Sequence, residues 1–257
     1  MLNIVNLNKK FNRGTPFEKT IFHDFNLALE EGTTALIGSN GCGKSTLLNL
    51  VSGRLKADSG RIEIGDRDVS PLKEEERSEM LGIVHQNPSM GVAPSLTILE
   101  NMAIADKKNE KFTLRKLIRK NRIGDYQELL KTLDLGLENQ LSTKIKYLSG
   151  GQRQSLSLLM ATMKHPRLLL LDEHTAALDP KTSKVVMDKT KNLIKNKEIT
   201  TLMVTHDMRD AVEYADRIIM LDRGKIILDK RKGEITETDL YDMYKDLLIR
   251  LEKEELE

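Results

Sequence analysis

The sequence predicts an α/β fold: a mixed, largely parallel sheet with helices, an antiparallel β part and an inserted helical part. Three observations predict it. A short apolar run at 33–37 is followed by a glycine loop and then by a helical pattern that begins near Thr46. Residues 168–171 are four consecutive leucines before two acids, which is typical of a strand buried on both faces of a parallel sheet. The stretch between, about 89–164, reads as helical.

The amino-terminal part is expected to form an antiparallel β edge. Short apolar-rich stretches that are bounded by turn residues predict the strands. The expected elements are, in order, strands over 1–7 and 22–29 with a loop at 9–14 between them, a strand at 61–64, a charged helix at 71–80 and a strand at 81–84. We expect the first two strands to pair antiparallel.

The rest of the chain alternates helices with strands. Thr97-x-x-Glu100 and Ser149-x-x-Gln152 are capping boxes, so we expect helices to begin there. Pro180 suits the first position of a helix. The expected elements are helices at 96–105, 125–133, 149–164 and 180–195, strands at 167–171 and 200–204, a helix at 211–215, a hairpin of 217–221 with 225–228, and an amphipathic helix at 236–251; the basic stretch 107–122 also has helical spacing.

The glycine loop reads G-x-x-x-x-G-K-S and lies between a predicted strand and a predicted helix, the context that a phosphate-binding loop needs. Its glycines let successive N–H groups point at phosphate oxygens, and the helix N-terminus adds partial positive charge. Lys44 can reach the β- and γ-phosphates, and the Ser45 hydroxyl can bind Mg²⁺. The residues expected to bind ATP here are Gly38, Ser39, Asn40, Gly41, Cys42, Gly43, Lys44, Ser45 and Thr46.

Two acids end the leucine strand. Asp172 can hold Mg²⁺ through water, and Glu173 can polarise the water that attacks the γ-phosphorus. The alternative is a solvated acidic turn, which is common at strand ends. A phosphate loop upstream in the same chain favours the catalytic interpretation.

Leu148-Ser149-Gly150-Gly151-Gln152 resembles the signature of the ATP-binding cassette (ABC) family. The phosphate loop, the leucine strand and His206 follow the same order as in that family, over about residues 1–230. The resemblance implies a P-loop NTPase cassette. Its ATPase core would take about 1–88 and 165–230, its helical signature subdomain about 89–164, and a carboxyl-terminal helix about 231–257.

The resemblance also implies that two copies pack head to tail as a homodimer, so that Leu148, Ser149, Gly150, Gly151 and Gln152 of one copy face the ATP of the other. Physical chemistry supports this arrangement. A helix N-terminus with two glycines and a serine offers N–H groups, a hydroxyl and positive dipole to a γ-phosphate. The alternative is an ordinary helix start.

Other roles follow residue by residue from the resemblance. Gln86 matches the glutamine that touches Mg²⁺ or the attacking water and relays the nucleotide state to the helical part. His206 matches the histidine that contacts the γ-phosphate and orients Glu173. Asp179 matches an aspartate that crosses the dimer interface, and it also suits the cap of the helix that begins at Pro180.

The adenine needs an aromatic platform, and the chain has no Trp. Phe11 lies where the family places its stacking aromatic residue. Phe17 and Phe22 are alternatives, and a core role is open for each of the three.

Two departures from the family pattern follow Glu173. His174 stands where the family more often has Pro, and Ala176 where it often has Ser; neither change removes a phosphate or metal ligand. The strings 172–180 and 152–162 resemble a bacterial importer branch for tryptophan/tyrosine-type amino acids. The sequence is therefore interpreted as an ATP-hydrolysing subunit that uses ATP and Mg²⁺ to power uptake. An exporter ATPase or a non-transport mechanochemical ATPase is the alternative.

Composition limits the partners. The 41 basic and 39 acidic residues are interspersed, which gives no broad electrostatic case for nucleic acid. No apolar run could span a membrane, so a partner must hold the chain there if it works at a membrane. The resemblance implies permease subunits and an extracytoplasmic binding protein as partners, and so a location at the cytoplasmic face of the membrane. Cys42 alone rules out an internal disulfide and suits a reducing compartment. Its place at a helix N-terminus predicts a lowered thiol pKa, so we expect alkylation to block ATP hydrolysis and bound ATP to protect.

Overall fold

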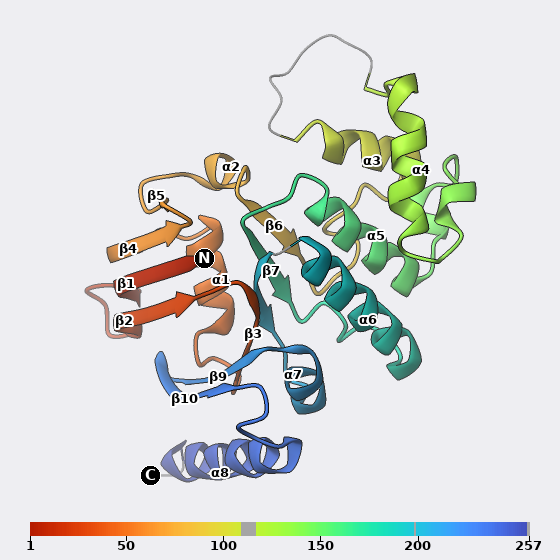
Figure 1. Cartoon of the computed structure of the whole chain (residues 1–257). Coiled ribbons are helices and arrows are strands. Elements are labelled where there is room, and N and C mark those ends of the chain that lie inside the picture. Colours follow the sequence, from red (N-terminus) through yellow and green to blue (C-terminus); the bar gives the residue numbers. More distant parts are fainter. Residues whose placement is uncertain (109–116, 198, 256–257) are drawn as a thin grey trace. The chain divides into compact units, whose positions relative to one another are not determined.

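The computed structural model describes residues 1–108, 117–197 and 199–255, and it divides into two compact units. The first unit comprises Met1–Arg77 and Thr200–Glu257, and the second comprises Ser78–Ile199. Both units combine helices with strands (Figure 1). Among the described residues, no helix has the length and apolar character needed to cross a bilayer.

An antiparallel sheet opens the first unit. Its strands, in spatial order, are β2 (Lys19–Leu29), β1 (Leu2–Phe11), β4 (Ser59–Ile64) and β5 (Arg67–Asp68). The expected antiparallel pairing of the first two strands is confirmed, with Leu2 opposite Leu29. β1 is longer than expected, because residues 9–11, predicted as loop, pair with β2 after register shifts. Such bulges break the apolar alternation by which a strand is recognised in a sequence.

A second sheet of the first unit carries the phosphate loop. Its strands, in spatial order, are β10 (Lys225–Arg231), β9 (Arg217–Asp222), β3 (Gly32–Gly38) and β8 (Thr200–Val204). β3 runs parallel to both neighbours, and β10 returns antiparallel as the expected hairpin. Ala35, Leu36 and Ile37 have no exposed surface, as expected for a central parallel strand.

Helices complete the first unit: α1 (Lys44–Ser52), α2 (Glu74–Arg77), α7 (Met208–Tyr214) and α8 (Glu237–Glu255). The helix expected over 71–80 is only one turn long. Its last residue, Arg77, is buried and donates hydrogen bonds to the carbonyls of Leu50 (2.7 Å) and Val51 (3.0 Å) in the last turn of α1. These are among the carbonyls that a helix end leaves unpaired, so the Arg77 side chain stabilises the end of α1.

The second unit joins two parallel strands to helices. β6 (Leu81–Val84) pairs with β7 (Leu168–Asp172), with Val84 beside Leu171. The helices are α3 (Ile98–Asp106), α4 (Ile123–Lys131), α5 (Gly150–Thr162) and α6 (Pro180–Lys197), with short 3₁₀ helices η1 (Lys120–Arg122), η2 (Leu137–Asn139) and η3 (Ile145–Tyr147). Both capping boxes are confirmed. Within the basic stretch 107–122, residues 109–116 lie outside the described residues, and the expected subdomain boundaries stay predictions.

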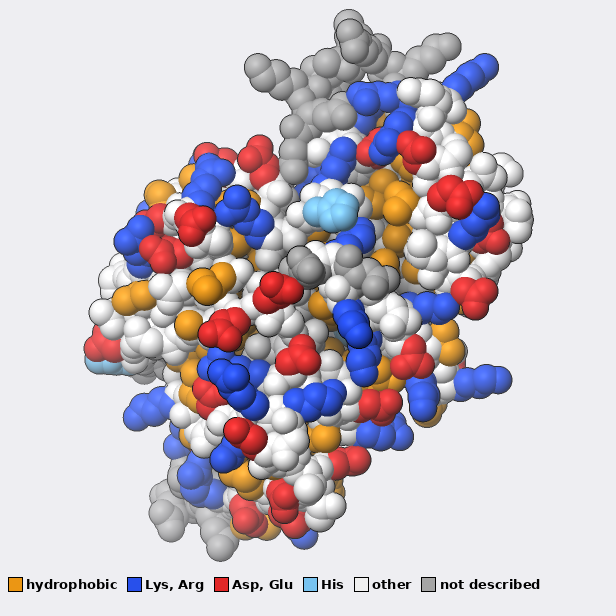
Figure 2. Space-filling view, in the orientation of Figure 1, with side chains coloured by type: hydrophobic (Ala, Val, Ile, Leu, Met, Phe, Trp, Pro, Cys, Tyr) orange, Lys and Arg blue, Asp and Glu red, His pale blue; other side chains and the backbone are white. Residues whose placement is uncertain are grey.

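Charged side chains of both signs are intermingled on the face that Figure 2 shows. The chain as a whole has 41 basic and 39 acidic residues, so neither sign of charge dominates its composition. Oppositely charged neighbours screen one another, so long-range electrostatic steering on this face is weak.

The buried carboxylate of Asp106 links three segments of the second unit. Asp106, at the end of α3, accepts hydrogen bonds from Arg122 (3.0 Å) and the hydroxyl of Tyr126 (2.9 Å), and it pairs with Lys164 at 3.1 Å. Burial opposes ionisation, but the hydrogen bonds outweigh it and lower the pKa of Asp106 to about 2. Burial and the neighbouring Asp106 raise the pKa of Tyr126 to about 12.

We expect Asp106→Asn to lower the free energy of unfolding by about 2 kcal/mol near neutral pH. Because the folded pKa lies below the ordinary value, this stabilisation is complete above about pH 5 and declines to roughly half at pH 3. Urea unfolding monitored by circular dichroism at several pH values measures it. Asp134→Asn is the matched control, since the Asp134 side chain is 91% exposed. An equal effect of both substitutions at pH 7 would contradict the prediction.

Candidate functional site

The phosphate loop joins the end of β3 to the start of α1. A Cβ atom at Gly38 would lie 2.2 Å from the carbonyl oxygen of Leu221 on β9, and Gly38 has φ 151°. Gly224, at the turn of the β9–β10 hairpin, donates a hydrogen bond to the carbonyl of Cys42 at 3.0 Å. The β9–β10 hairpin therefore packs against the phosphate loop and holds it by a hydrogen bond. Because Leu221 lies so close, only glycine fits at position 38.

Lys44 is the first residue of α1, and its side chain is buried against the loop. Its ammonium donates to the carbonyls of Gly38 (2.7 Å) and Ser39 (3.0 Å). Among the described residues, no side chain caps the start of α1. The N–H groups of this helix end and the adjacent ammonium form an anion-binding arrangement, and the exposed Ser45 lies on the first turn.

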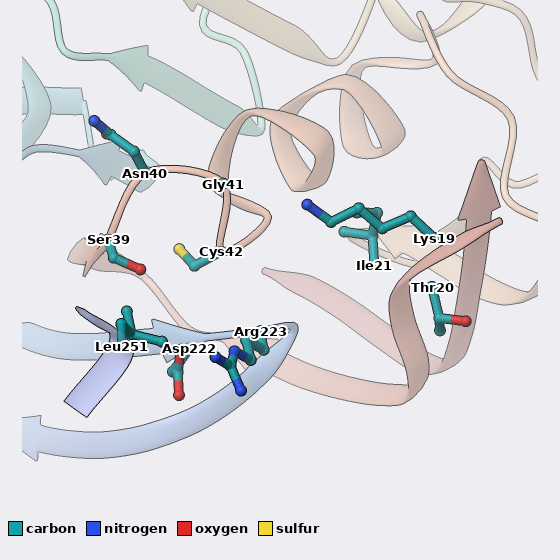
Figure 3. A pocket seen from close by; sticks show the side chains of 10 residues that line it. All are labelled: Lys19, Thr20, Ile21, Ser39, Asn40, Gly41, Cys42, Asp222, Arg223 and Leu251. Carbon is teal, nitrogen blue, oxygen red and sulfur yellow. The ribbon is translucent and has the colours of Figure 1, made fainter. Parts of the chain in front are cut away.

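Cys42 differs from expectation. Its side chain is 3% exposed, and its sulfur lies inside the curve of the loop (Figure 3). Burial raises the pKa of Cys42, although Lys44 nearby acts in the opposite direction. The expected lowering of the pKa by the helix N-terminus is therefore wrong, because desolvation of a thiolate outweighs a partial helix charge. The expected block of ATP hydrolysis by alkylation stays a prediction.

His206 lies at the same edge of the sheet as the phosphate loop. β8 and β3 are parallel neighbours with Val204 beside Leu36, and the N–H of Thr205 donates to the carbonyl of Leu36. The two strands therefore end at the same edge of the sheet. β3 leads into the phosphate loop, and β8 leads to His206, which is exposed. Asp207 follows as the N-cap of α7, and it fixes the turn that carries the histidine.

A pocket of about 280 Å³ lies beside the phosphate loop. Figure 3 shows Lys19 extending from β2 toward the loop, with Arg223 of the hairpin and Leu251 of α8 on the other side. The lining residues are Lys19, Thr20, Ile21, Ser39, Asn40, Gly41, Cys42, Asp222, Arg223 and Leu251. Sequence reasoning identified the loop residues of this pocket but not its β2 and hairpin residues, which carry no motif.

The aromatic candidates for adenine differ in exposure. Phe11 pairs with the pocket residue Lys19 across β1 and β2, and the ammonium of Lys9 lies 5.3 Å from its ring centre. Phe22 is 1% exposed and packs on Phe25 with ring centres 4.8 Å apart, which is a core role. Phe17 is 79% exposed. Phe11 therefore remains the candidate that neighbours the pocket.

The second unit brings Gln86 and Glu173 together. Each follows one of the paired strands β6 and β7, and the Gln86 amide nitrogen donates to a Glu173 carboxylate oxygen at 3.2 Å. Asp172 precedes Glu173 at the strand end and is half-buried. Glu173 has φ 43°, a conformation that costs a non-glycine residue free energy and that clusters at functional sites.

The start of α5 presents its polar groups to solvent. The Ser149 hydroxyl oxygen accepts from the N–H of Gln152 at 3.2 Å, and the Gln152 side chain accepts from the N–H of Ser149 at 3.0 Å. Ser149 and Gly150 are exposed, whereas Leu148 is buried and anchors the turn. Because Ser149 uses its oxygen as an acceptor, its hydroxyl hydrogen can still be donated to an anion.

Helix α6 supports the start of α5. A Cβ atom at Gly151 would lie 2.3 Å from Cγ2 of Thr182, so only glycine permits this approach. Asp179 caps α6 by accepting from the N–H of Thr182 at 3.1 Å. The structure thus shows the capping role of Asp179, and its role in a dimer stays a prediction.

One contact in the second unit was not predicted. The Gln154 side chain, on α5, donates to the carbonyl of His85 at 3.1 Å, and His85 precedes Gln86. This bond ties the helix that starts at Ser149 to the strand end that carries Gln86. The two partners are 69 residues apart in sequence, so no local pattern could reveal the bond.

A family model described as "ABC transporter" matches residues 22–176. The chain belongs to the ABC transporter family. It is 43% identical over 248 residues to a protein named "Tyrosine transport ATP-binding protein" from Clostridioides difficile strain R20291, covering 95% of this chain and 98% of the relative. It is 34% identical to "Phosphonates import ATP-binding protein PhnC" from Lactococcus lactis subsp. cremoris, covering 95% and 99%. The chain is thus an ATP-binding subunit of an ABC transporter.

Solved structures show the same fold. An ATP-binding cassette solved as a dimer in a post-hydrolysis state with ADP and Pi aligns with a TM-score of 0.75 at 28% identity, covering 91% of this chain and all of that one. CbiO1 from Clostridium perfringens, part of the ABC transporter complex cbiONQ, aligns with a TM-score of 0.76 at 25% identity, covering 97% and 93%. The ABC subunit therefore has the expected P-loop α/β cassette fold.

We expect Cys42 to react with iodoacetamide at least about tenfold more slowly in the folded ABC subunit than in urea, because its thiol is buried and its pKa is raised. The rate of mass increase between pH 7 and pH 9 measures this. The chain has one cysteine, so the readout needs no site assignment. Equal rates in the folded and unfolded states would contradict the buried, protonated thiol.

Proposed function

We propose that this protein hydrolyses ATP to power a bacterial importer for an aromatic amino acid of the tyrosine and tryptophan type. The contact between Gln86 and Glu173 carries the hydrolytic part of the proposal, because it holds a carboxylate at the strand edge where a general base is needed. The resemblance of the whole chain to a tyrosine transport subunit supports the transport part.

The phosphate loop would bind the triphosphate. Lys44 would exchange the carbonyls of Gly38 and Ser39 for the β- and γ-phosphates, a change from neutral to anionic acceptors. The uncapped N-terminus of α1 would add its N–H groups. Phe11 would stack on adenine beside the pocket at Lys19.

The oxygen donors needed for Mg²⁺ are present. Mg²⁺ prefers hydroxyl, carboxylate and amide oxygens together with phosphate. Ser45 offers an exposed hydroxyl, Asp172 a half-buried carboxylate, and Gln86 an amide oxygen, since its amide nitrogen already donates to Glu173. When bound, Mg²⁺ would neutralise charge on the β- and γ-phosphates.

Glu173 would accept a proton from the attacking water, with Gln86 orienting the carboxylate. His206 would contact the γ-phosphate. Each role uses a group at the carboxyl end of a parallel strand, where ligands of open α/β sheets bind.

A second copy would complete the site. Ser149 retains a donatable hydroxyl hydrogen, and Gly150 leaves its backbone exposed, so the start of α5 can serve the γ-phosphate held by another copy. A solved relative of the same fold is a dimer with ADP and Pi, which supports a homodimer. Permease subunits in the membrane and a binding protein outside would be the other partners, with this subunit at the cytoplasmic face.

Replacing the proposed base tests the mechanism. We expect Glu173→Gln to bind ATP and Mg²⁺, to lose hydrolysis by roughly a hundredfold or more, and to accumulate as a dimer with bound ATP. Light scattering after size exclusion measures the dimer, and phosphate release measures turnover. Glu31→Gln, at an exposed position in the turn before β3, is the matched control.

The trapped dimer also tests the role of Ser149. Aspartate caps a helix as well as serine does, but its carboxylate cannot donate to a phosphate and repels it. Adding Ser149→Asp to Glu173→Gln should therefore keep the fold and abolish the dimer. Rapid turnover by Glu173→Gln would remove Glu173 as the base, and a dimer that survives Ser149→Asp would exclude head-to-tail packing.

Uptake by intact cells tests the substrate. In the organism that encodes this chain, deletion of its gene should reduce uptake of labelled tyrosine or tryptophan and leave phosphonate uptake unchanged. Identity of 43% to the tyrosine transport relative, against 34% to a phosphonate import relative, favours this outcome. Complementation with Glu173→Gln should fail, while wild type should restore uptake. Unchanged uptake of both amino acids would overturn the substrate assignment.

A further inference from the structure

The turn that carries Glu173 is held in a strained conformation. Glu173 has φ 43°, in the left-handed region, where a non-glycine residue is disfavoured by roughly 1 kcal/mol or more. Such a conformation persists only when neighbouring contacts fix it. The Glu173 carbonyl accepts from the N–H of Ala176 at 3.0 Å within the turn, and Gln86 contacts the end of the Glu173 side chain. Neither contact ties the backbone of this turn to a neighbouring helix, so a side chain of the turn that does so adds a tertiary restraint.

His174 supplies this restraint. Its side chain is 2% exposed, and its Nε2 lies 3.2 Å from the hydroxyl oxygen of Thr190 on α6. Thr190 donates its own hydroxyl hydrogen to the carbonyl of Val186 at 2.8 Å. The hydroxyl therefore accepts from His174, which requires the tautomer with hydrogen on Nε2. Burial lowers the pKa of His174 to about 4, so the ring stays neutral near pH 7.

The same helix supports the start of α5. Thr182, on the first turn of α6, lies against Gly151, and a Cβ at Gly151 would also approach Val186 within 4.0 Å. Val186 is the residue whose carbonyl accepts from Thr190. Two turns of α6, from Thr182 through Val186 to Thr190, therefore connect the start of α5 at Gly151 to the hydrogen bond between His174 and Thr190.

We propose that His174 is a positioning residue for hydrolysis: its hydrogen bond to Thr190 anchors the Glu173 turn to α6, the helix that also seats the start of α5. The proposal rests on the proposed function of Glu173 as general base. His174 does not touch ATP or water in this role. Its hydrogen bond to Thr190 fixes the backbone that directly follows Glu173, and this in turn fixes the direction of the Glu173 carboxylate.

Two amide substitutions at position 174 test whether a hydrogen bond to Thr190 is what matters. A glutamine amide can place its nitrogen near the position of His Nε2, whereas an asparagine amide is one methylene shorter and cannot reach Thr190. We expect His174→Asn to lower kcat for ATP roughly tenfold with KM changed less than about twofold, since a misplaced catalytic group costs rate without costing ground-state binding. His174→Gln should restore kcat to within about threefold of wild type.

The partner residue gives an independent arm. Thr190→Val removes the acceptor with little change in shape and should reproduce the loss of kcat, while Thr190→Ser keeps the hydroxyl and the activity. Combining Thr190→Val with His174→Asn should lower kcat little further than either change alone, because both remove one interaction. Nitrogen NMR of labelled histidine should show His174 neutral with its hydrogen on Nε2 at pH 7.

The outcomes distinguish this inference from the proposed function. If wild type hydrolyses ATP and Glu173→Gln does not, but His174→Asn and Thr190→Val keep wild-type kcat, the positioning role is overturned while Glu173 remains the base. If the variants lower only thermal stability, with kcat per folded subunit unchanged, His174 is merely structural and the inference also fails. If Glu173→Gln hydrolyses ATP normally, the proposed function fails first.

Discussion

Parallel strand pairing in register is the constraint on which the candidate site depends. In the first unit, Val204 lies beside Leu36, so the phosphate loop and His206 leave the sheet at one edge. In the second unit, Val84 lies beside Leu171, so Gln86 and Glu173 meet in the same way. The strands β3, β8 and β7 are buried on both faces, so a slip of one residue would place each side chain where one of another shape packs. The burial and close packing of these side chains oppose that slip. The same burial therefore stabilises the fold and aligns the functional groups.

Backbone strain and close packing occur at the ends of these strands and at the start of α5. Gly38 and Gly151 permit approaches that any Cβ would prevent, the first to β9 and the second to α6. Glu173 adopts a left-handed conformation without being glycine. Short, rigid supports of this kind fix a functional group to within fractions of an ångström, which a solvated loop could not do. The strain of these supports lowers stability, and the burial of apolar side chains in β3 and β7 offsets that loss.

Much of this could be predicted from local patterns. The phosphate loop, both capping boxes and the leucine strand are each encoded within a few residues, so the sequence alone predicts them. The sequence does not predict the extension of β1 to Phe11, because bulges break its alternation. It also predicts a longer α2, because it does not show that Arg77 is buried with its side chain bonded to the end of α1. The thiol pKa of Cys42 was predicted in the wrong direction, since its burial depends on residues of the β9–β10 hairpin and α1 that only the fold brings together.

Under the proposed function, Lys44 would make the phosphate loop select for charge and not merely for shape. Its ammonium already has two carbonyl acceptors at 2.7 and 3.0 Å, so a ligand gains little by offering it another neutral acceptor. A phosphate oxygen offers a full charge, and hydrogen bonds between ionised partners are roughly twice as strong as neutral ones. Burial of the lysine lowers the local dielectric and enlarges that difference. The proposed exchange of acceptors at Lys44 would thus favour polyphosphates over neutral ligands of similar size.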